Sequence, residues 1–144
     1  MVCKIKDLYS KPFNCKIVDI PYFNFIDEIL SQKPLEETEY FKYIYSQLKR
    51  YGTVFEKIKD KQGVINRTQQ FRDLAYSIKK EYKPVVETCY KNGLPYGGIT
   101  TIKKSDKIFV VDGHHRLAVL SYLGYDEVEV YVSENNSNNY GNDI

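Results

Sequence analysis

Residues 108–125 read IFVVDGHHRLAVLSYLGY, and this stretch decides the fold. Its first four residues are β-branched or aromatic, which is typical of a strand, and they lead without a loop into the polar residues 112–116. Apolar residues then recur at helical spacing, at Leu117, Leu120 and Leu123. Gly124 stands where a helix cap is expected. The stretch therefore predicts a strand, a tight turn and a helix, with the polar side chains gathered in the turn.

The predicted turn carries an acid, a glycine, two imidazoles and a guanidinium, at Asp112, Gly113, His114, His115 and Arg116. The first turn of a helix leaves backbone N–H groups unpaired and has the positive end of the helix dipole. Gly113 lets the backbone approach a ligand closely, and Arg116 adds a forked, permanent positive charge that suits phosphate oxygens. These features predict an anion site with phosphate as its ligand.

The same string resembles the signature of the ParB/sulfiredoxin superfamily, because it lies between a strand and a helix with a further strand at 127–132. The free-serine kinase branch carries the same D-G-H-H-R string, whereas ParB partition proteins have G-E-R-R over Gly113 to Arg116 and sulfiredoxins have G-C-H-R. Upstream, Arg67 and the run at 68–80 look like the family's arginine and its L-A-x-S-I-K helix. Residues 99–102 stand where the family has its P-I-V-V strand. The resemblance covers the second half of the chain better than the first.

The bulk composition is that of a soluble globular protein, with 144 residues, 42% hydrophobic and 28% charged. One domain over residues 1–132 is expected, followed by a polar, disordered tail at 133–144. A net charge of +2 gives no electrostatic argument for a nucleic-acid or membrane partner, so any basic patch must come from folding. Because the chain has neither an apolar run of ~20 residues nor a signal peptide, a cytoplasmic protein is expected.

Strands and helices mix without strict alternation, which predicts an α+β fold: a small mixed sheet with helices packed mainly on one side, of ParB/sulfiredoxin type by resemblance. Gly63 interrupts the helical pattern within 53–65 and leaves that stretch ambiguous. The other expected elements are a strand at 16–21, a helix within 34–50 closed by Gly52, a helix at 69–80 with Thr68 as N-cap, a loop at 83–98 with one helical turn around 86–90, and strands at 99–102, 108–111 and 127–132.

Several chemical roles stay open at the turn. Asp112 is the helix N-cap, a ligand of Mg²⁺, or a base that takes a proton from an attacking hydroxyl. Because a carboxylate repels phosphate, phosphate binding here predicts a requirement for Mg²⁺. His114 and His115 diverge by about a hundred degrees on a helix, so they do not chelate one metal ion. One of the two is expected to bind phosphate or act as an acid, and the other to pack into the sheet.

Further roles follow from the resemblance alone. Arg67 is expected as a second phosphate contact, with a surface arginine as the alternative. The kinases have a catalytic glutamate after their first strand, and Glu36 or Glu37 stands at a loosely comparable place. Both also fit as acids that stabilise a helix start. Sulfiredoxins carry their catalytic cysteine at the position of His114, so sulfinic-acid reduction is excluded.

The function favoured by the sequence is a Mg²⁺-dependent NTPase or phosphotransferase, with a small molecule or a macromolecule as acceptor. Residues 113–116 would hold the phosphates of ATP, ADP or CTP, and Asp112 would coordinate Mg²⁺ or act as base. The alternative is a ParB-like nucleotide switch or nucleic-acid-associated module. The sequence argues against this alternative, because no helix-turn-helix of the kind that reads DNA follows residue 132. A metal nuclease ranks third, since only Asp112 lies near the motif, and a domain that has lost its chemistry ranks fourth.

Overall fold

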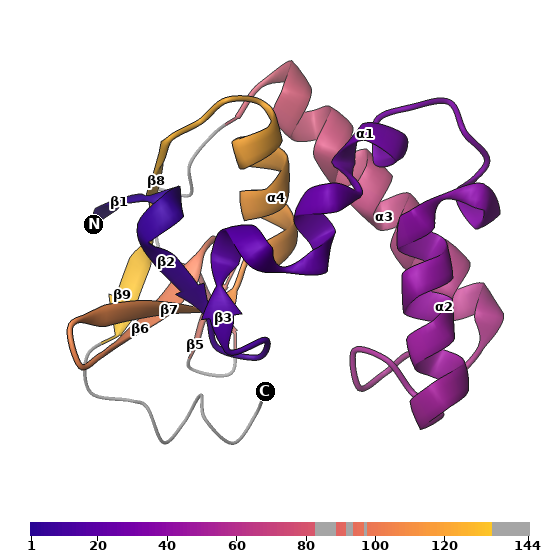
Figure 1. Ribbon diagram of the computed structural model, residues 1–144, viewed down its shortest axis with the longest axis horizontal. Coiled ribbons are helices and arrows are strands. Elements are labelled where there is room, and N and C mark those ends of the chain that lie inside the picture. The colour runs from indigo at the N-terminus through magenta and orange to yellow at the C-terminus, as the bar shows by residue number, and fades with distance from the viewer. Residues whose placement is uncertain (83–88, 92–93, 97, 134–144) are drawn as a thin grey trace. The chain divides into compact units, whose positions relative to one another are not determined.

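A computed structural model describes residues 1–82, 89–91, 94–96 and 98–133 of the chain (Figure 1). Contacts divide the chain into two compact units. A mixed unit contains Met1–Phe23 and Tyr82–Ile144, and a helical unit contains Asn24–Glu81. The fold is α+β, as the sequence predicts, with both parallel and antiparallel strands. The single domain expected over residues 1–132 stays a prediction.

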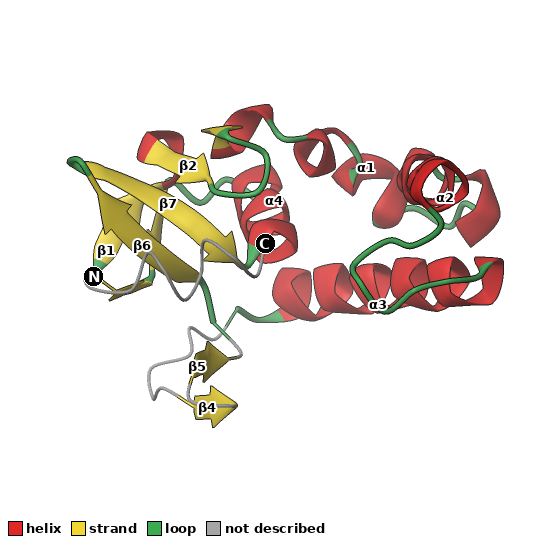
Figure 2. Cartoon of the chain, turned by 90° about the horizontal axis from the view of Figure 1, so that it is seen from below, coloured by secondary structure: helices red, strands yellow, loops and turns green. Residues whose placement is uncertain are grey.

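The mixed unit is built on a five-stranded sheet with the strand order β3-β2-β7-β6-β9. Figure 2 labels its three inner strands, β2, β7 and β6. The strands are β2 Leu8–Ser10, β3 Cys15–Lys16, β6 Thr100–Lys104, β7 Lys107–Asp112 and β9 Tyr131–Ser133. β7 lies in the middle, parallel to β2 and antiparallel to β6, while β6 and β9 are parallel. Because β7 ends at Asp112, the polar turn begins where the central strand ends.

Smaller elements complete the mixed unit. β1 Val2–Lys4 pairs antiparallel with β8 Glu127–Glu129, and β4 Cys89–Lys91 pairs antiparallel with β5 Leu94–Tyr96. Three 3-10 turns, at Ile5–Asp7, Ile17–Asp19 and Pro21–Asn24, connect the first strands and lead out of them. Apolar side chains from both halves of the chain form the core, including Leu8, Ile17, Ile20, Ile102, Val110, Leu117, Leu120 and Val128.

Three predicted elements of this unit are wrong in part. The strand expected at 16–21 is a 3-10 turn from Ile17 to Asp19, and only Lys16 lies in a strand. The strand expected at 127–132 is divided into β8 and β9, because Val130 N–H donates to Met1 O while Tyr131 N–H donates to Ile99 O. The expected loop contains two strands, Cys89–Lys91 and Leu94–Tyr96, so Cys89 and Tyr90 do not belong to a helical turn; residues 86–88 lie outside the described residues.

The C-terminal tail predicted at 133–144 starts one residue too early. Ser133 lies in β9 and pairs in register with Ile102 of β6. The expected disorder at 134–144 lies outside the described residues.

The helical unit contains α1 Ile26–Ile29, a 3-10 turn at Leu35–Glu37, α2 Glu39–Tyr51 and α3 Lys61–Lys80. α2 confirms the helix expected within 34–50. It begins where Thr38 Oγ1 accepts a hydrogen bond from Phe41 N–H, at 3.2 Å, and ends at Gly52, whose φ is +79°. The buried apolar face of α2 consists of Tyr40, Phe41, Ile44 and Leu48.

α3 begins at Lys61 and not at Gln69, so the predicted start is wrong. Asp60 is the N-cap, and its Oδ1 accepts a hydrogen bond from Gly63 N–H at 2.8 Å. Gly63 does not break the helix, because it lies in the first turn and makes room for Ile58: a Cβ on Gly63 would lie 2.8 Å from Ile58 Cγ2. Thr68, expected as the N-cap, lies inside the helix and donates its hydroxyl hydrogen to Val64 O at 2.8 Å.

The helical unit is tied together by Arg72 of α3. Its Nε donates to Ile29 O at 2.8 Å, and its Nη2 donates to Lys33 O at 2.7 Å and to Glu28 O at 3.4 Å. Carbonyls at the C-terminal end of a helix have no partners within the helix, so Arg72 satisfies the end of α1. The arginine therefore fixes α1 and the segment after it against α3.

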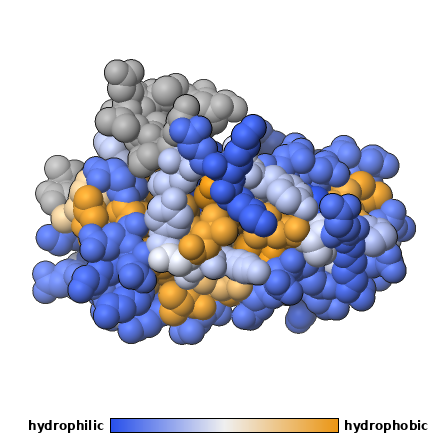
Figure 3. All heavy atoms as spheres, turned by 90° about the horizontal axis from the view of Figure 1, so that it is seen from above, coloured by the Kyte–Doolittle hydropathy of each residue, from blue (hydrophilic) through white to orange (hydrophobic). Residues whose placement is uncertain are grey.

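Hydrophilic side chains cover most of the face shown in Figure 3, and apolar side chains reach this face as patches. None of the helices in the described part of the chain combines the length and the apolar character needed to span a membrane.

Replacing Arg72 should destabilise the protein. A buried hydrogen bond from a charged donor contributes about 1.5–3 kcal/mol, and one that water can replace contributes less. The bonds of Arg72 are part-buried or exposed, so Arg72→Ala is expected to lower the free energy of unfolding by about 2 kcal/mol in total. Arg72→Lys should recover little, because an ammonium group cannot reach carbonyls in the forked geometry of guanidinium. Urea denaturation measures the free energy of unfolding of both variants. Arg50→Ala, at an exposed position, is the control, and a loss for Arg72→Ala no larger than for Arg50→Ala would contradict the role.

Candidate functional site: the turn between β7 and α4

The predicted strand, turn and helix are confirmed as β7, Gly113 and α4, which spans His114–Tyr122. Gly113 has φ +107° and ψ 15°, a left-handed conformation that favours glycine. A Cβ on Gly113 would also lie 3.0 Å from Ile99 Cγ1 and 3.1 Å from Ile99 Cα. The turn therefore requires glycine both for its backbone angles and for its contact with Ile99.

The end of α4 follows the sequence prediction as well. Gly124 has φ +95°, its N–H donates to Ser121 O at 3.0 Å, and Tyr125 N–H donates to Leu120 O at 3.0 Å. This pair of hydrogen bonds is a Schellman motif, which satisfies carbonyls that the helix leaves free. Both ends of α4 are thus fixed by glycines in the left-handed region.

Asp112 is exposed at the end of β7, and its Oδ1 accepts a hydrogen bond from Gly113 N–H at 3.0 Å. The N-cap of α4 is Gly113, and no side chain caps the helix. The N-cap role expected as one alternative for Asp112 is therefore wrong. An exposed carboxylate beside an uncapped helix start remains available to a cation or a proton.

His114 is the packed member of the histidine pair. Its side chain is 8% exposed, and its Nε2 lies 2.8 Å from Ser10 Oγ on β2. Ser10 Oγ also accepts a hydrogen bond from Phe13 N–H at 3.1 Å. Burial lowers the pKa of His114 to about 4, so the imidazole is neutral near pH 7. His114 thus links α4 to the sheet, which argues against the expected contact with phosphate and against a role as catalytic acid.

His115 is the more exposed of the two histidines. Its side chain is half-buried and stacks on the ring of Tyr22, with 4.3 Å between ring centroids and 22° between planes. The two histidines therefore contact different partners, as neighbouring positions on a helix require. Of the pair, His115 is the one placed to meet a ligand at the turn.

Arg116 lies half-buried in the first turn of α4, and within the described part of the chain no carboxylate is within ion-pair distance of its guanidinium. Burial raises the pKa of the Tyr82 hydroxyl, and the nearby charge of Arg116 opposes that rise. The first hydrogen bond of the helix runs from Leu117 N–H to Gly113 O, and the N–H groups of His114 and Arg116 have no acceptor among the described residues. Among the described residues, a cation without a carboxylate partner and amides without acceptors therefore meet at one turn.

Three further candidate residues belong to the helical unit. The guanidinium carbon of Arg67, on α3, lies 4.9 Å from the centre of the Phe55 ring. Its charge opposes the rise to about 12 that burial causes in the pKa of Tyr40. Glu36 forms an ion pair with Lys61 at 3.1 Å, and Glu37 is exposed in the same 3-10 turn. The roles expected for these residues from the family resemblance stay predictions.

The structure thus brings together Asp112, Gly113, His115 and Arg116 at one turn. In the described residues no group of three or more histidine, cysteine, aspartate or glutamate side chains is placed to hold a metal ion. A Mg²⁺ ion at Asp112 would therefore take most of its ligands from phosphate oxygens and water, as Mg²⁺ in nucleotide sites commonly does.

Sequence reasoning missed the residues that position the site. Ser10 holds His114, Tyr22 stacks on His115, and Tyr82 lies near Arg116. All three come from segments far from the motif in the chain. No local pattern indicates them, because the parallel pairing of β2 with β7 creates the first contact and non-local packing creates the others.

Comparison of this chain with protein-family models, with curated proteins and with solved structures gave no match. The ParB/sulfiredoxin resemblance therefore stays a prediction that rests on the D-G-H-H-R string and its surroundings.

The buried His114 should make the protein sensitive to acid. Its folded pKa of about 4 lies below the value of 6.5 for a free histidine, so the unfolded chain binds the proton more tightly. This contribution to stability is fully present above pH 6.5 and is lost as the pH falls toward 4, and the loss at pH 4 amounts to about 3 kcal/mol.

Urea denaturation between pH 7 and pH 4 tests this sign. His114→Gln, which does not titrate, should lose less stability over that range than the wild type. His115→Gln is the control and should keep the acid dependence of the wild type. Parallel pH profiles for wild type and His114→Gln would show that the histidine does not titrate as inferred.

Proposed function

We propose that the turn between β7 and α4 binds the phosphates of a nucleotide, ATP, ADP or CTP, together with Mg²⁺, and that the protein is a cytoplasmic NTPase or phosphotransferase of ParB/sulfiredoxin type. The proposal rests mainly on the surroundings of Arg116. Its cation is half-buried, and among the described residues no carboxylate lies within ion-pair distance of it. A partly desolvated positive charge favours an anionic partner, and guanidinium matches two phosphate oxygens at once.

The backbone supports the same ligand. α4 starts without a side-chain cap, and the N–H groups of His114 and Arg116 point out of the first helical turn without acceptors in the described part of the chain. Phosphate oxygens at a helix N-terminus accept hydrogen bonds from such groups and interact favourably with the helix dipole. Backbone and side chain therefore favour the same kind of group.

Asp112 supplies the second part of the proposed chemistry. The exposed carboxylate at the end of β7 would repel phosphate by itself, so Asp112 would hold a Mg²⁺ ion whose charge would offset that repulsion. In this role Asp112 would hold the metal, Arg116 would neutralise charge on the transferred phosphoryl group, and His115 would donate a hydrogen bond to that group. Phosphoryl transfer requires mainly such positioning and charge neutralisation.

Nucleotide binding should depend on Arg116. We expect wild type to bind at least one of ATP, ADP and CTP with Mg²⁺, and Arg116→Ala to bind it about ten- to a hundred-fold more weakly, because a charge-assisted contact is lost. Arg116→Lys should recover only part of the affinity. Titration calorimetry measures these affinities, and Lys104→Ala, at an exposed position in β6, is the matched control. Equal affinities for wild type and Arg116→Ala would contradict the proposal.

Turnover should depend on Asp112 and on Mg²⁺. In an assay of phosphate release, wild type is expected to exceed background only with Mg²⁺, and Asp112→Asn should be at least ten-fold slower because it lacks the metal-binding charge. Lys104→Ala serves again as control. If wild type binds nucleotide tightly but turns it over only at the background rate, the enzymatic function is excluded and the nucleotide switch remains as the function.

A further inference from the structure

The end of α2 and the segment that follows it are basic and aromatic. Residues 40–55 include three basic residues, four tyrosines and two phenylalanines, but no acid. From residue 42 to residue 67 the chain has seven basic residues and two acidic ones, although the whole chain is nearly balanced at +2. Asp60, one of these two acids, is engaged as the N-cap of α3. This stretch of the helical unit therefore carries a local excess of positive charge.

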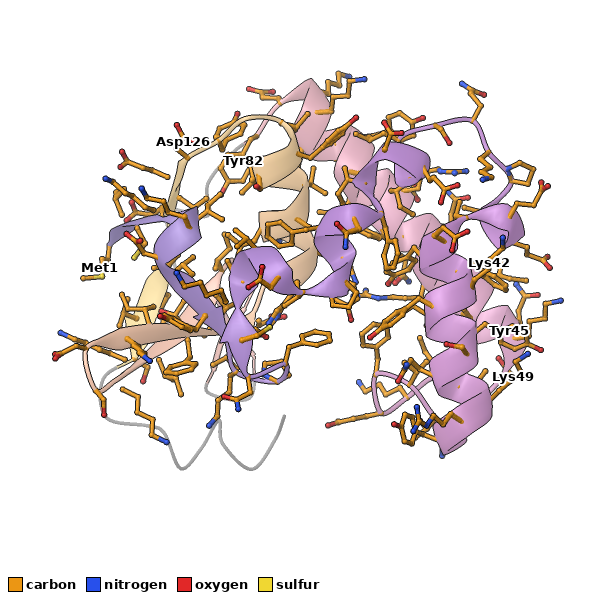
Figure 4. All side chains as sticks on the ribbon, in the orientation of Figure 1. Met1, Lys42, Tyr45, Lys49, Tyr82 and Asp126 are labelled. Atoms are coloured by element: carbon orange, nitrogen blue, oxygen red, sulfur yellow. The ribbon has the colours of Figure 1, made fainter. Side chains whose placement is uncertain are left out.

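Cations and aromatic rings are in contact at this end. Lys49 Nζ lies 4.7 Å from the centre of the Tyr45 ring, Lys61 Nζ lies 5.8 Å from the same ring, and Arg50 Cζ lies 5.4 Å from the Tyr51 ring. Figure 4 shows Tyr45 and Lys49 on the same side of α2. The basic-aromatic surface is defined here as Tyr45, Lys49, Arg50, Tyr51, Phe55 and Lys61. Lys61 also forms an ion pair with Glu36, which neutralises part of its charge. Lys49 and Arg50 are therefore the main source of positive charge on the basic-aromatic surface.

Two rings of this surface are open to solvent. Tyr51 is 63% exposed and Phe55 is 38% exposed. Phe55 has φ +51° and the next residue, Glu56, has φ +63°, conformations that are unfavourable for a bulky side chain. The loop is closed by mutual backbone hydrogen bonds between Val54 and Ile58, at 3.0 and 3.1 Å. A compact, strained loop thus holds an aromatic side chain at the surface.

We propose that the basic-aromatic surface binds single-stranded nucleic acid. Lys49 and Arg50 would contact backbone phosphates, and Tyr51 and Phe55 would stack against bases. A basic surface that follows the backbone, combined with exposed rings, is the arrangement with which proteins bind single strands without reading their sequence. A duplex keeps its base faces stacked inside the helix and presents only edges, so exposed rings favour the single strand over the duplex.

This surface lies within the helical unit and uses none of the residues of the β7–α4 turn. The proposal therefore goes beyond nucleotide binding at that turn. Oligonucleotides and mononucleotides are separate probes, so failure of one proposal leaves the other intact.

Fluorescence anisotropy with labelled 20-nucleotide probes tests the proposal. Wild type is expected to bind single-stranded DNA and RNA at least ten-fold more tightly than duplex DNA of the same sequence, and more weakly in 200 mM than in 50 mM salt. The double variant Lys49→Ala/Arg50→Ala should lose at least ten-fold in affinity for single strands. It should also lower the slope of log affinity against log salt by about 1.4, since two phosphate contacts are lost.

The aromatic contribution is tested separately. Tyr51→Leu/Phe55→Leu keeps apolar side chains but removes the rings, and it should weaken single-strand binding about ten-fold or more with an unchanged salt slope. Lys79→Ala/Lys80→Ala removes two exposed charges from the other end of α3 and is the matched control, with affinity within two-fold of wild type. Thermal melting followed by circular dichroism confirms that each variant is folded.

Three outcomes would overturn the proposal: duplex binding as tight as single-strand binding, an affinity of Tyr51→Leu/Phe55→Leu equal to wild type, or an equal loss in the Lys79→Ala/Lys80→Ala control. The first or second would show a surface that binds polyanions by charge alone. The third would show that overall charge, and not this surface, governs binding.

Discussion

The close passage of Gly113 against Ile99 is the constraint on which the candidate site depends. Only a residue without a side chain can take the left-handed backbone of this turn and lie against Ile99 at the same time. The turn therefore sets the direction in which α4 begins. As a result, neighbouring side chains in the first turn of that helix lie in different environments. His114 enters the interior and bonds to Ser10, while Arg116 stays half-buried without a carboxylate partner among the described residues.

The sequence predicts those elements that contain their own start and stop signals. α2 is closed by Gly52, and α4 lies between Gly113 and Gly124, so local chemistry marks these three boundaries. The strands β1 and β2 have three residues each, which is too short for any periodic pattern, and they form because β8 and β7 offer partners. The sequence does not indicate the start of α3, because Gly63 resembles a helix breaker until its contact with Ile58 is known.

The candidate site also has one part that the local sequence predicts and one part that depends on contacts between distant segments. The turn and its residue types are evident in the motif, since strand, glycine and helix are consecutive in the chain. Which histidine is buried is not evident, because the choice depends on Ser10, a residue that sheet pairing brings to the helix from the other end of the chain. Charge is different, because it is local in the chain: the net charge of +2 hides the basic stretch at residues 42–67, which the sequence itself contains.

The two units also differ in how their contacts are distributed along the chain. The helical unit is made of consecutive residues, whereas the mixed unit joins residues 1–23 to residues beyond 81. The parallel pairing of β2 with β7 requires strands that are about a hundred positions apart, a long loop closure that slows folding. On the ribosome this pairing cannot form before the segment with Lys107–Asp112 has emerged, by which time the whole helical unit has been synthesised. The order of synthesis thus gives the helices the earlier opportunity to fold.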